Sequence, residues 1–296
     1  MDSSINSQIF NLDYLAVIEV SGADSAKFLQ GQLTCNVNDL SDSQASIAGF
    51  CTAKGRVISS LIIIKTADVF CLLLPASLLD KVLKKLQMYV LRSAVKLVDQ
   101  RQQWAVYGLQ AQQSANPEEP VFSVNQADFI TIKLPSALSR YLMIRPIQSS
   151  VSVNQVSNDA WRYQDIVDGL PWFEFEQSEQ YTPQMLNIDQ LGGISFTKGC
   201  YTGQEIVART HYLGKAKRSL FAAQSNQLLA LPCEGFAVLD SQTQQTVGHV
   251  LTAQHYLQQT YLLIVLQVAD VDSPSLVLDD QQRSVITLIA SELNHD

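Results

Sequence analysis

The sequence KGCYTGQEIVAR, from Lys198 to Arg209, places a lone cysteine between two glycines just ahead of an expected helix. Glycine adopts backbone conformations that residues with a Cβ avoid, so Gly199 and Gly203 allow the backbone to run close to a ligand or a partner. The segment from Gln204 onward is typical of a helix. Glu205 would lie in its first turn, where an acidic side chain suits the helix dipole.

Cys200 allows two interpretations. The cation of Lys198 and the N-terminus of the following helix would favour the thiolate form, which is the reactive one. A free cysteine is more commonly a small buried hydrophobic residue, and the spacing alone favours that burial. A catalytic pair with His211 is not expected, because the intervening residues would separate the two side chains by roughly 16 Å if helical.

The composition is that of a globular protein, with 296 residues, 47% hydrophobic and 16% charged. This length suffices for two domains or for one unit with several cores. The net charge of -8 argues against a dedicated nucleic-acid binder, although it leaves room for a local basic patch. Five cysteines without CxxC spacing fit neither a disulfide framework nor a zinc site. We therefore expect reduced thiols, a cytoplasmic location and no metal site.

The start of the chain lacks the basic and apolar regions of a signal peptide. The longest apolar runs, at 61–64 and 262–266, are far too short to span a bilayer, so they are expected to be core strands. No phosphate-binding GxGxxG or GxxxxGK[ST] loop, HExxH motif or GxSxG elbow is present. These absences leave dinucleotide, metalloprotease and serine hydrolase functions without support.

Hydrophobic periodicity predicts an α+β arrangement for the first part of the chain, with helices on a largely antiparallel sheet. Strands are expected at residues 14–20, 47–52, 57–64, 69–74, 95–98, 104–109, 129–134 and 141–146. Helices are expected at residues 23–33, 77–91 and 159–167. The stretch 174–193 is expected to be an ordered loop.

The helical signal disappears after Lys217. Short strands are expected at residues 218–223, 246–253, 260–269 and 284–290, separated by turn residues, which indicates a small β-barrel. We therefore place a domain boundary near residue 214, with an α+β region over 1–214 and the barrel over 215–296.

Two further features each have a functional and an ordinary interpretation. Basic residues without an acidic one gather in the segment 209–218, at Arg209, His211, Lys215, Lys217 and Arg218. This segment either contacts phosphate, RNA or a polyglutamate tail or is a solvated loop, and its charge alone favours the loop. Trp161 either stacks on an aromatic heterocycle or fills the core, and core packing is the commoner role.

Three runs in the second half of the chain occur together: PQMLN at 183–187, GGISF at 192–196 and KGCYTGQEIVAR at 198–209. The first half adds SGAD at 21–24, FLQGQLT at 28–34 and AKGR at 53–56. With these runs the chain closely resembles the YgfZ-type folate-binding proteins of the glycine-cleavage T-protein superfamily. The resemblance extends from about residue 12 to residue 218, and the barrel agrees only in outline.

The resemblance implies a three-lobed cloverleaf, with ferredoxin-like lobes around a central channel in which tetrahydrofolate sits, and a small C-terminal β-barrel. It implies that Trp161 stacks on the folate and that a second contact, usually aromatic, falls at Leu15. It implies further folate contacts within the run KGCYTGQEIVAR, at Gly199, Tyr201, Gly203, Gln204 and Glu205. Cys200 would be the functional thiol, with Lys198 assisting it.

The chain departs from the superfamily's enzymes at two places. The aminomethyltransferases carry paired aspartates after the first hairpin, where this chain has Ser59 and Ser60. A serine hydroxyl supplies no negative charge and is no general base near neutral pH, so we expect no aminomethyltransferase activity. The same enzymes bear an acidic residue where this chain has Cys200.

The resemblance thus implies an accessory protein rather than a classical enzyme. Its clients would be iron–sulfur enzymes, such as the radical enzymes that thiomethylate tRNA, with a transient contact to tRNA through the basic segment. Two alternatives stay open. One is a folate-dependent one-carbon transferase that uses Cys200 as its nucleophile, and the other is a non-catalytic interaction module in which Cys200 is structural.

Overall fold

A computed structural model describes residues 7–67, 69–148, 157–214, 216–267 and 275–289. The chain divides into two compact units, each described here by itself. Unit 1 consists of Met1–Cys51, Ile58–Asn158 and Leu191–Thr202, and unit 2 of Thr52–Val57, Asp159–Gln190 and Gly203–Asp296. The boundary predicted near residue 214 falls within unit 2 and stays a prediction.

The first sheet of unit 1 has five strands in the order β3-β4-β5-β2-β6. Their bounds are β2 Leu15–Ser21, β3 Ser46–Cys51, β4 Val57–Thr66, β5 Val69–Pro75 and β6 Lys96–Asp99. The sequence VISSLIII is buried along β4 without alternation, as expected of a strand covered on both faces. Strands β3 and β4 form a hairpin, because they are neighbours in the sheet and the Thr52 N–H donates to the Arg56 carbonyl (2.8 Å).

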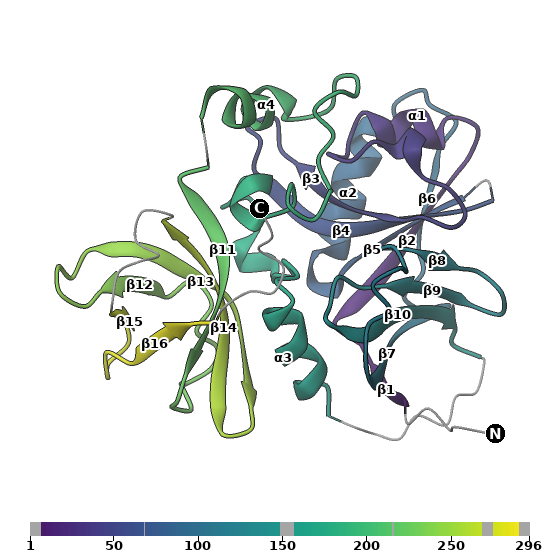
Figure 1. The fold of residues 1–296 in the computed structure, drawn as a ribbon. Coiled ribbons are helices and arrows are strands. Elements are labelled where there is room, and N and C mark those ends of the chain that lie inside the picture. Colours follow the sequence, from purple (N-terminus) through teal and green to yellow (C-terminus); the bar gives the residue numbers. More distant parts are fainter. Residues whose placement is uncertain (1–6, 68, 149–156, 215, 268–274, 290–296) are drawn as a thin grey trace. The chain divides into compact units, whose positions relative to one another are not determined.

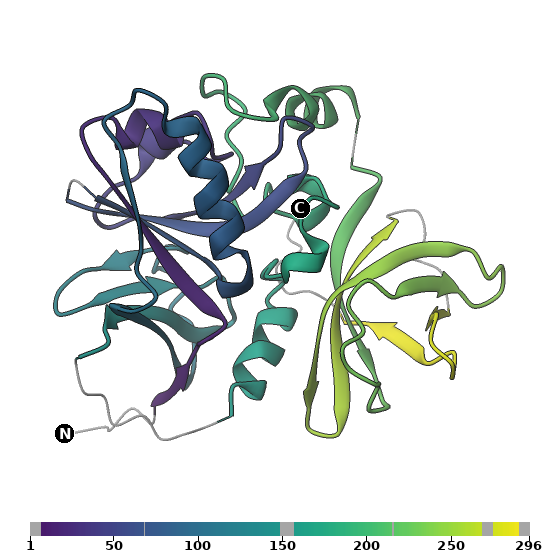
Figure 2. The same ribbon diagram turned by 180° about the vertical axis from the view of Figure 1, so that it is seen from behind.

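Helix α2 (Leu79–Val90) packs on this sheet against β2 and β6, as Figure 2 shows. Its buried residues Leu79, Val82 and Leu86 recur at helical spacing, which gives the helix one apolar face. The shorter helix α1 (Ser25–Gln30) contacts β5 and the 3₁₀ turn η1 (Val37–Asp39). A second 3₁₀ turn, η2 (Ala76–Leu78), leads into α2.

The second sheet of unit 1 also has five strands, in the order β1-β7-β10-β9-β8, and they pair antiparallel. The strands are β1 Ser7–Asn11, β7 Trp104–Ser114, β8 Val124–Asn125, β9 Ile130–Lys133 and β10 Leu138–Pro146. The predicted strands therefore divide between two sheets. β1 and β8 were not predicted, because neither carries a hydrophobic alternation long enough to register.

Unit 2 contains a closed barrel of six strands in the order β11-β14-β13-β12-β15-β16 (Figure 1). They are β11 Arg218–Ser225, β12 Ala237–Asp240, β13 Thr246–Tyr256, β14 Gln259–Gln267, β15 Leu276–Leu278 and β16 Val285–Leu288. The predicted barrel is confirmed, with two short strands, β12 and β15, added to the four expected. Residues 268, 269 and 290, also predicted as strand, lie outside the described residues.

Helix α3 (Asp159–Val167) packs against β13 and β14 of the barrel. Its Tyr163 ring stacks on Tyr256 with centroids 4.5 Å apart and meets Tyr261 edge-on at 4.4 Å. The predicted loop over 174–193 contains two 3₁₀ turns, η3 (Phe175–Gln177) and η4 (Pro183–Leu186). Helix α4 (Gln204–Leu213) follows the cysteine motif as predicted.

Within the part of the chain that the structure describes, no helix is both long enough and apolar enough to cross a membrane. The α+β class and the C-terminal barrel predicted from the sequence are thus confirmed. The ferredoxin-like form of the lobes and their arrangement as a cloverleaf stay predictions.

Candidate functional site

The thiol of Cys200 is exposed, whereas the four other cysteines are buried. Those buried residues are Cys35, Cys51, Cys71 and Cys233. The burial that the spacing alone favoured for Cys200 is therefore wrong. A side chain in contact with solvent is available for chemistry, and it makes little contribution to packing.

Lys198, two residues before the thiol, is buried with its ammonium group inside unit 1. Its Nζ donates to the carbonyl oxygens of Leu33 (2.8 Å) and Cys35 (2.7 Å). Burial lowers the pKa of this ammonium to about 8, and the nearby Cys35 thiol opposes the shift. Lys198 thereby attaches the start of the cysteine loop to the segment that follows α1. Its predicted action on the Cys200 thiol stays a prediction.

Tyr201 and Thr202 hold the other side of the loop. The Tyr201 ring is buried, with the Lys198 ammonium 5.0 Å from its centroid, and burial raises the pKa of its hydroxyl. The Thr202 N–H donates to the Gly31 carbonyl (3.1 Å), and its hydroxyl donates to Oε1 of Gln32 (3.3 Å). Cys200 is therefore an exposed thiol between two anchored residues.

The segment before the loop is attached to the same part of unit 1. The Thr34 hydroxyl donates to the Gly193 carbonyl (2.6 Å) and accepts from the Gly49 N–H (2.8 Å). The Ser195 N–H donates to the Thr34 carbonyl (2.9 Å). The runs FLQGQLT and GGISF, far apart in the sequence, thus meet through a buried threonine.

The two glycines of the motif differ in whether the surrounding structure leaves room for a Cβ. Gly203 has a φ of +86°, and a Cβ at this position would lie 2.5 Å from the Thr52 carbonyl oxygen and 3.0 Å from the Gly55 Cα. Gly203 therefore allows the backbone to approach the Thr52–Gly55 segment of the same chain, and the predicted approach to a ligand or a partner stays a prediction. A Cβ at Gly199 would meet no atom within 4 Å, so the structure gives no packing reason for glycine there.

The run PQMLN supports the motif from within unit 2. The Gln184 side chain donates to the Val207 carbonyl of α4 (2.7 Å). Asn187, which has a φ of +54°, donates to the Leu220 carbonyl of β11 (2.9 Å) and accepts from the Leu220 N–H (3.1 Å). This run therefore joins α4 to the barrel, and that structural work explains its residues without a ligand.

Four other predicted site residues lie on α3, β2 and α4. Trp161, on α3, has no exposed surface, and Leu15, at the start of β2, is 5% exposed. Gln204 and Glu205 form the first turn of α4, and Glu205 is exposed. A folate would need an open ring face to stack on, so the buried Trp161 fits that role only after the ring is uncovered.

Two other predicted features can be placed. Ser59 and Ser60 are buried on β4, and the Ser59 hydroxyl donates to the Ser60 carbonyl (2.7 Å), so these positions offer no carboxylate.

Of the basic segment, Arg209 and His211 lie on α4, Arg218 begins β11, and Lys215 lies outside the described residues. Burial lowers the pKa of the neighbouring His249 imidazole, and Arg218 adds to that shift.

Comparison with known proteins gives three kinds of match: a family model, related sequences and a solved structure. The model of the GCVT N-terminal domain family matches residues 5–133. The tRNA-modifying protein YgfZ of Colwellia psychrerythraea (strain 34H / ATCC BAA-681) is 30% identical over 298 residues, covering 94% of this chain and 91% of that protein. The chain belongs to the YgfZ family.

Another YgfZ protein, from Klebsiella pneumoniae (strain 342), is 34% identical over 231 residues and covers 72% of this chain and 70% of its own length. Among solved structures, the glycine cleavage system aminomethyltransferase T of Bartonella henselae matches with a TM-score of 0.73 at 14% identity. The match covers 97% of this chain and 86% of the aminomethyltransferase chain. At 14% identity it shows a shared fold.

Proposed function

We propose that this member of the YgfZ family serves tRNA modification as a folate-binding accessory protein of iron–sulfur enzymes, with Cys200 as its functional thiol. Its clients would include the radical enzymes that thiomethylate tRNA, in the cytoplasm. The observation that supports the proposal is the exposed Cys200 between two anchored residues, Lys198 and Thr202. The link to tRNA rests on the name of its relatives, tRNA-modifying protein YgfZ.

The thiol is suited to a transient role. Iron–sulfur clusters are usually held by four cysteine thiolates. The described residues contain no group of three or more His, Cys, Asp or Glu side chains that could hold a metal ion. Cys200 would therefore act for a short time on a group held by a client, such as a cluster or a persulfide, or on a one-carbon adduct of the folate.

Tetrahydrofolate, when bound, would supply a carrier for one-carbon units in the channel that the three lobes are proposed to surround. Trp161 would stack on the pterin or the aminobenzoyl ring, Leu15 would contact it, and further contacts would come from the motif. Trp161→Leu is expected to weaken tetrahydrofolate binding, measured by calorimetry, whereas Trp161→Phe keeps a ring that can stack. Equal affinity of all three proteins would contradict the assignment of Trp161.

The exposure of Cys200 bears on the two alternatives. In an interaction module with a purely structural cysteine, the thiol would be packed, which it is not. A one-carbon transferase would turn over a tetrahydrofolate derivative as purified protein and lose that turnover in Cys200→Ala. The basic segment at Arg209, His211, Lys217 and Arg218 would provide a transient contact to tRNA phosphates.

Complementation tests the proposal in a bacterial strain that lacks its own homologue. Wild type, Cys200→Ala and the control Thr197→Ala, an exposed residue of the same loop, are expressed at matched levels. Thiomethylated tRNA is measured by mass spectrometry. We expect rescue by wild type and Thr197→Ala and none by Cys200→Ala. Equal rescue by Cys200→Ala would remove the thiol from the mechanism, and no rescue by folded wild type would contradict the role in tRNA modification.

A further inference from the structure

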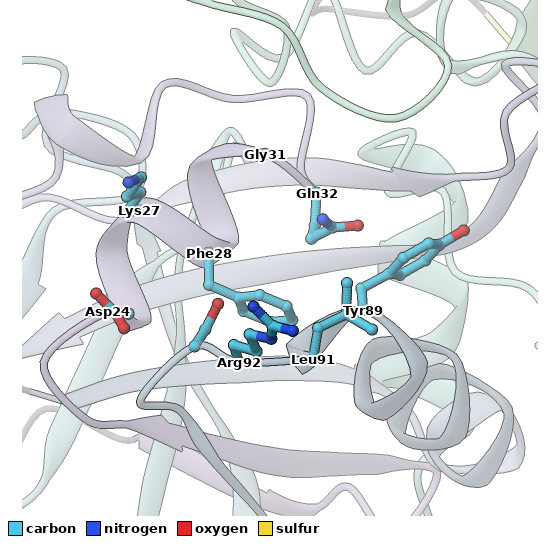
Figure 3. Close-up of a pocket in the computed structure, with 9 residues that line it drawn as sticks. Asp24, Lys27, Phe28, Gly31, Gln32, Tyr89, Leu91 and Arg92 are labelled. Atoms are coloured by element: carbon cyan, nitrogen blue, oxygen red, sulfur yellow. The ribbon is translucent and has the colours of Figure 1, made fainter.

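A pocket of about 800 Å³ lies in unit 1 between helix α1 and the C-terminal end of α2. In Figure 3, Lys27, Phe28 and Gln32 come from the α1 side, and Tyr89 and Arg92 come from the end of α2. Its volume is within the range of small-molecule binding sites. None of the roles proposed above uses this pocket.

The pocket favours a negatively charged ligand. Lys27 and Arg92 are exposed at its edge, and within the described part of the chain neither forms a hydrogen bond or an ion pair. A third cation, Lys85, lies 5.8 Å from the ring centroid of the lining Tyr89. The one acidic lining residue, Asp24, already accepts the Ala94 N–H (2.7 Å). In a chain of net charge -8, this is a local concentration of positive charge.

The pocket also offers flat apolar surface. The half-buried Tyr89 lines the pocket from α2 and offers a ring to a ligand, while Phe28, which is 7% exposed, contributes a mostly buried apolar wall from α1. Leu91, which is 87% exposed, lies at the edge. Aromatic faces of this kind bind planar rings, and stacking of a nucleobase on an aromatic side chain contributes about 1–3 kcal/mol.

A polar group completes the lining. Oε1 of Gln32 accepts from the Thr202 hydroxyl (3.3 Å), which leaves its amide N–H groups available to a ligand. Within the described residues these N–H groups have no partner. A side-chain amide can donate to the edge of a heterocyclic base.

The walls of the pocket are held together before any ligand binds. Gly22 has a φ of +112°, and a Cβ there would lie 2.2 Å from the Ala94 carbonyl oxygen, so glycine allows the two segments to meet. The Asp24 N–H donates to that same carbonyl (3.3 Å). A preformed site spares the ligand the entropic cost of ordering the residues that contact it.

We propose that this pocket binds a nucleotide, with its phosphate at Lys27 and Arg92 and its base against Tyr89. Phosphate alone would have no use for the aromatic surface, and an uncharged heterocycle would have none for the cations. The nucleotide could be supplied by an RNA strand or be a free mononucleotide. This inference goes beyond the thiol role proposed above and can be tested without it.

The pocket is connected to the cysteine loop by two hydrogen bonds. Gly31 and Gln32 line the pocket, and both bind Thr202, two residues after the exposed thiol. A nucleotide that contacts Gln32 would therefore act on one of the two anchors of the loop. We expect occupation of the pocket to slow the alkylation of Cys200.

Binding is measured by calorimetry with adenosine 5′-monophosphate and by fluorescence anisotropy with labelled single-stranded pentaadenylate. The variants are Arg92→Gln, which removes one of the two cations proposed to contact the phosphate, and Tyr89→Leu, which removes the stacking surface. Each is expected to weaken binding about tenfold, the effect of a lost charged hydrogen bond or stacked base. Lys84→Gln, an exposed lysine on α2 outside the lining, removes the same charge and is expected to change nothing.

Tighter binding of pentaadenylate than of the mononucleotide would identify RNA as the source, and the reverse would identify a free nucleotide. The proposal is overturned if folded wild type binds neither probe or if both variants bind like wild type. A second readout needs no variant. The rate at which iodoacetamide modifies Cys200 should fall at saturating mononucleotide, and an unchanged rate would place the ligand elsewhere. The binding assays use purified protein. A negative binding result, which would contradict the nucleotide site, can therefore be told apart from a negative complementation result, which would contradict the proposed function.

Discussion

The two halves of the cysteine motif are continuous in sequence but belong to different units of the structure. Lys198 to Thr202 lies in unit 1, and Gly203 begins the part of unit 2 that contains α4. In the first half, the side chains of Lys198 and Thr202 bind Leu33, Cys35 and Gln32, and the Thr202 N–H adds a bond to the Gly31 carbonyl. In the second half, the Gly203 backbone packs closely against Thr52 and Gly55, and the Gln184 side chain donates to the Val207 carbonyl of α4.

This difference shows that one sequence motif contains two kinds of constraint. In the first half, the polar anchors Lys198 and Thr202 fix the loop and leave the thiol between them exposed. In the second half, Gly203 is constrained by its close packing against the turn of Thr52 to Gly55. Substitutions in the two halves should therefore fail for different reasons.

The largest effect is expected for Gly203→Ala. The positive φ of +86° disfavours any side chain, and the new Cβ would lie 2.5 Å from the Thr52 carbonyl oxygen. We expect a loss of about 3 kcal/mol or more in the free energy of unfolding, measured by urea denaturation. Gly199→Ala is the matched control, because its Cβ meets no atom within 4 Å, and its change should stay below about 0.5 kcal/mol. Similar losses for both variants would remove the contrast between the halves.

A second effect should appear in the pH dependence of stability. Burial lowers the pKa of Lys198 from its usual 10.5 to about 8. Between these values the unfolded chain holds a proton that the folded chain has released, so stability rises with pH. The contribution of Lys198 is complete above pH 10.5 and is lost as pH falls through about 8. The stability of wild type relative to Lys198→Met should therefore rise by up to about 3 kcal/mol across this window.

This comparison is made by urea denaturation of both proteins at several pH values across the window. Other titrating groups, including Cys35 and Tyr201, are present in both proteins and largely cancel in the difference. Lys84→Met, at an exposed lysine, should show no such rise. A difference that stays constant with pH would mean that the Lys198 ammonium keeps its usual pKa and is not the buried anchor of the first half.

The sequence predicts the long elements well because their patterns repeat over many residues. The apolar face of α2 was recognised from its helical period, and β4 from its continuous apolar run. The strands β8 and β15 have two and three residues, which is too short for a period to show. The assignment of strands to two sheets depends on pairings between distant segments, such as β1 with β7, which local patterns do not contain.

The geometry of the candidate site follows from the sequence only in part. The close approach required at Gly203 follows from glycine, whereas the direction of the Lys198 side chain does not follow from its position beside Cys200. The bond between Thr202 and Gln32 joins residues 170 positions apart, and no spacing rule reveals it. The pocket at α1 and α2 was missed for the same reason, since its aromatic and basic residues come from two segments far apart in the sequence, 24–32 and 89–93.

The smallest change in stability is expected for Cys200→Ala, because an exposed thiol packs against little. Its free energy of unfolding should lie within about 0.5 kcal/mol of wild type. Cys51→Ala, at a fully buried thiol of the same unit, should lose about 1 kcal/mol or more through the space it leaves. In the native protein iodoacetamide should modify Cys200 alone, as counted by mass spectrometry, since burial raises the pKa of the Cys51 thiol to about 12 and shields it from the reagent. Rapid modification of a second cysteine, or a large loss in Cys200→Ala, would show that the first half of the motif is packed like the second.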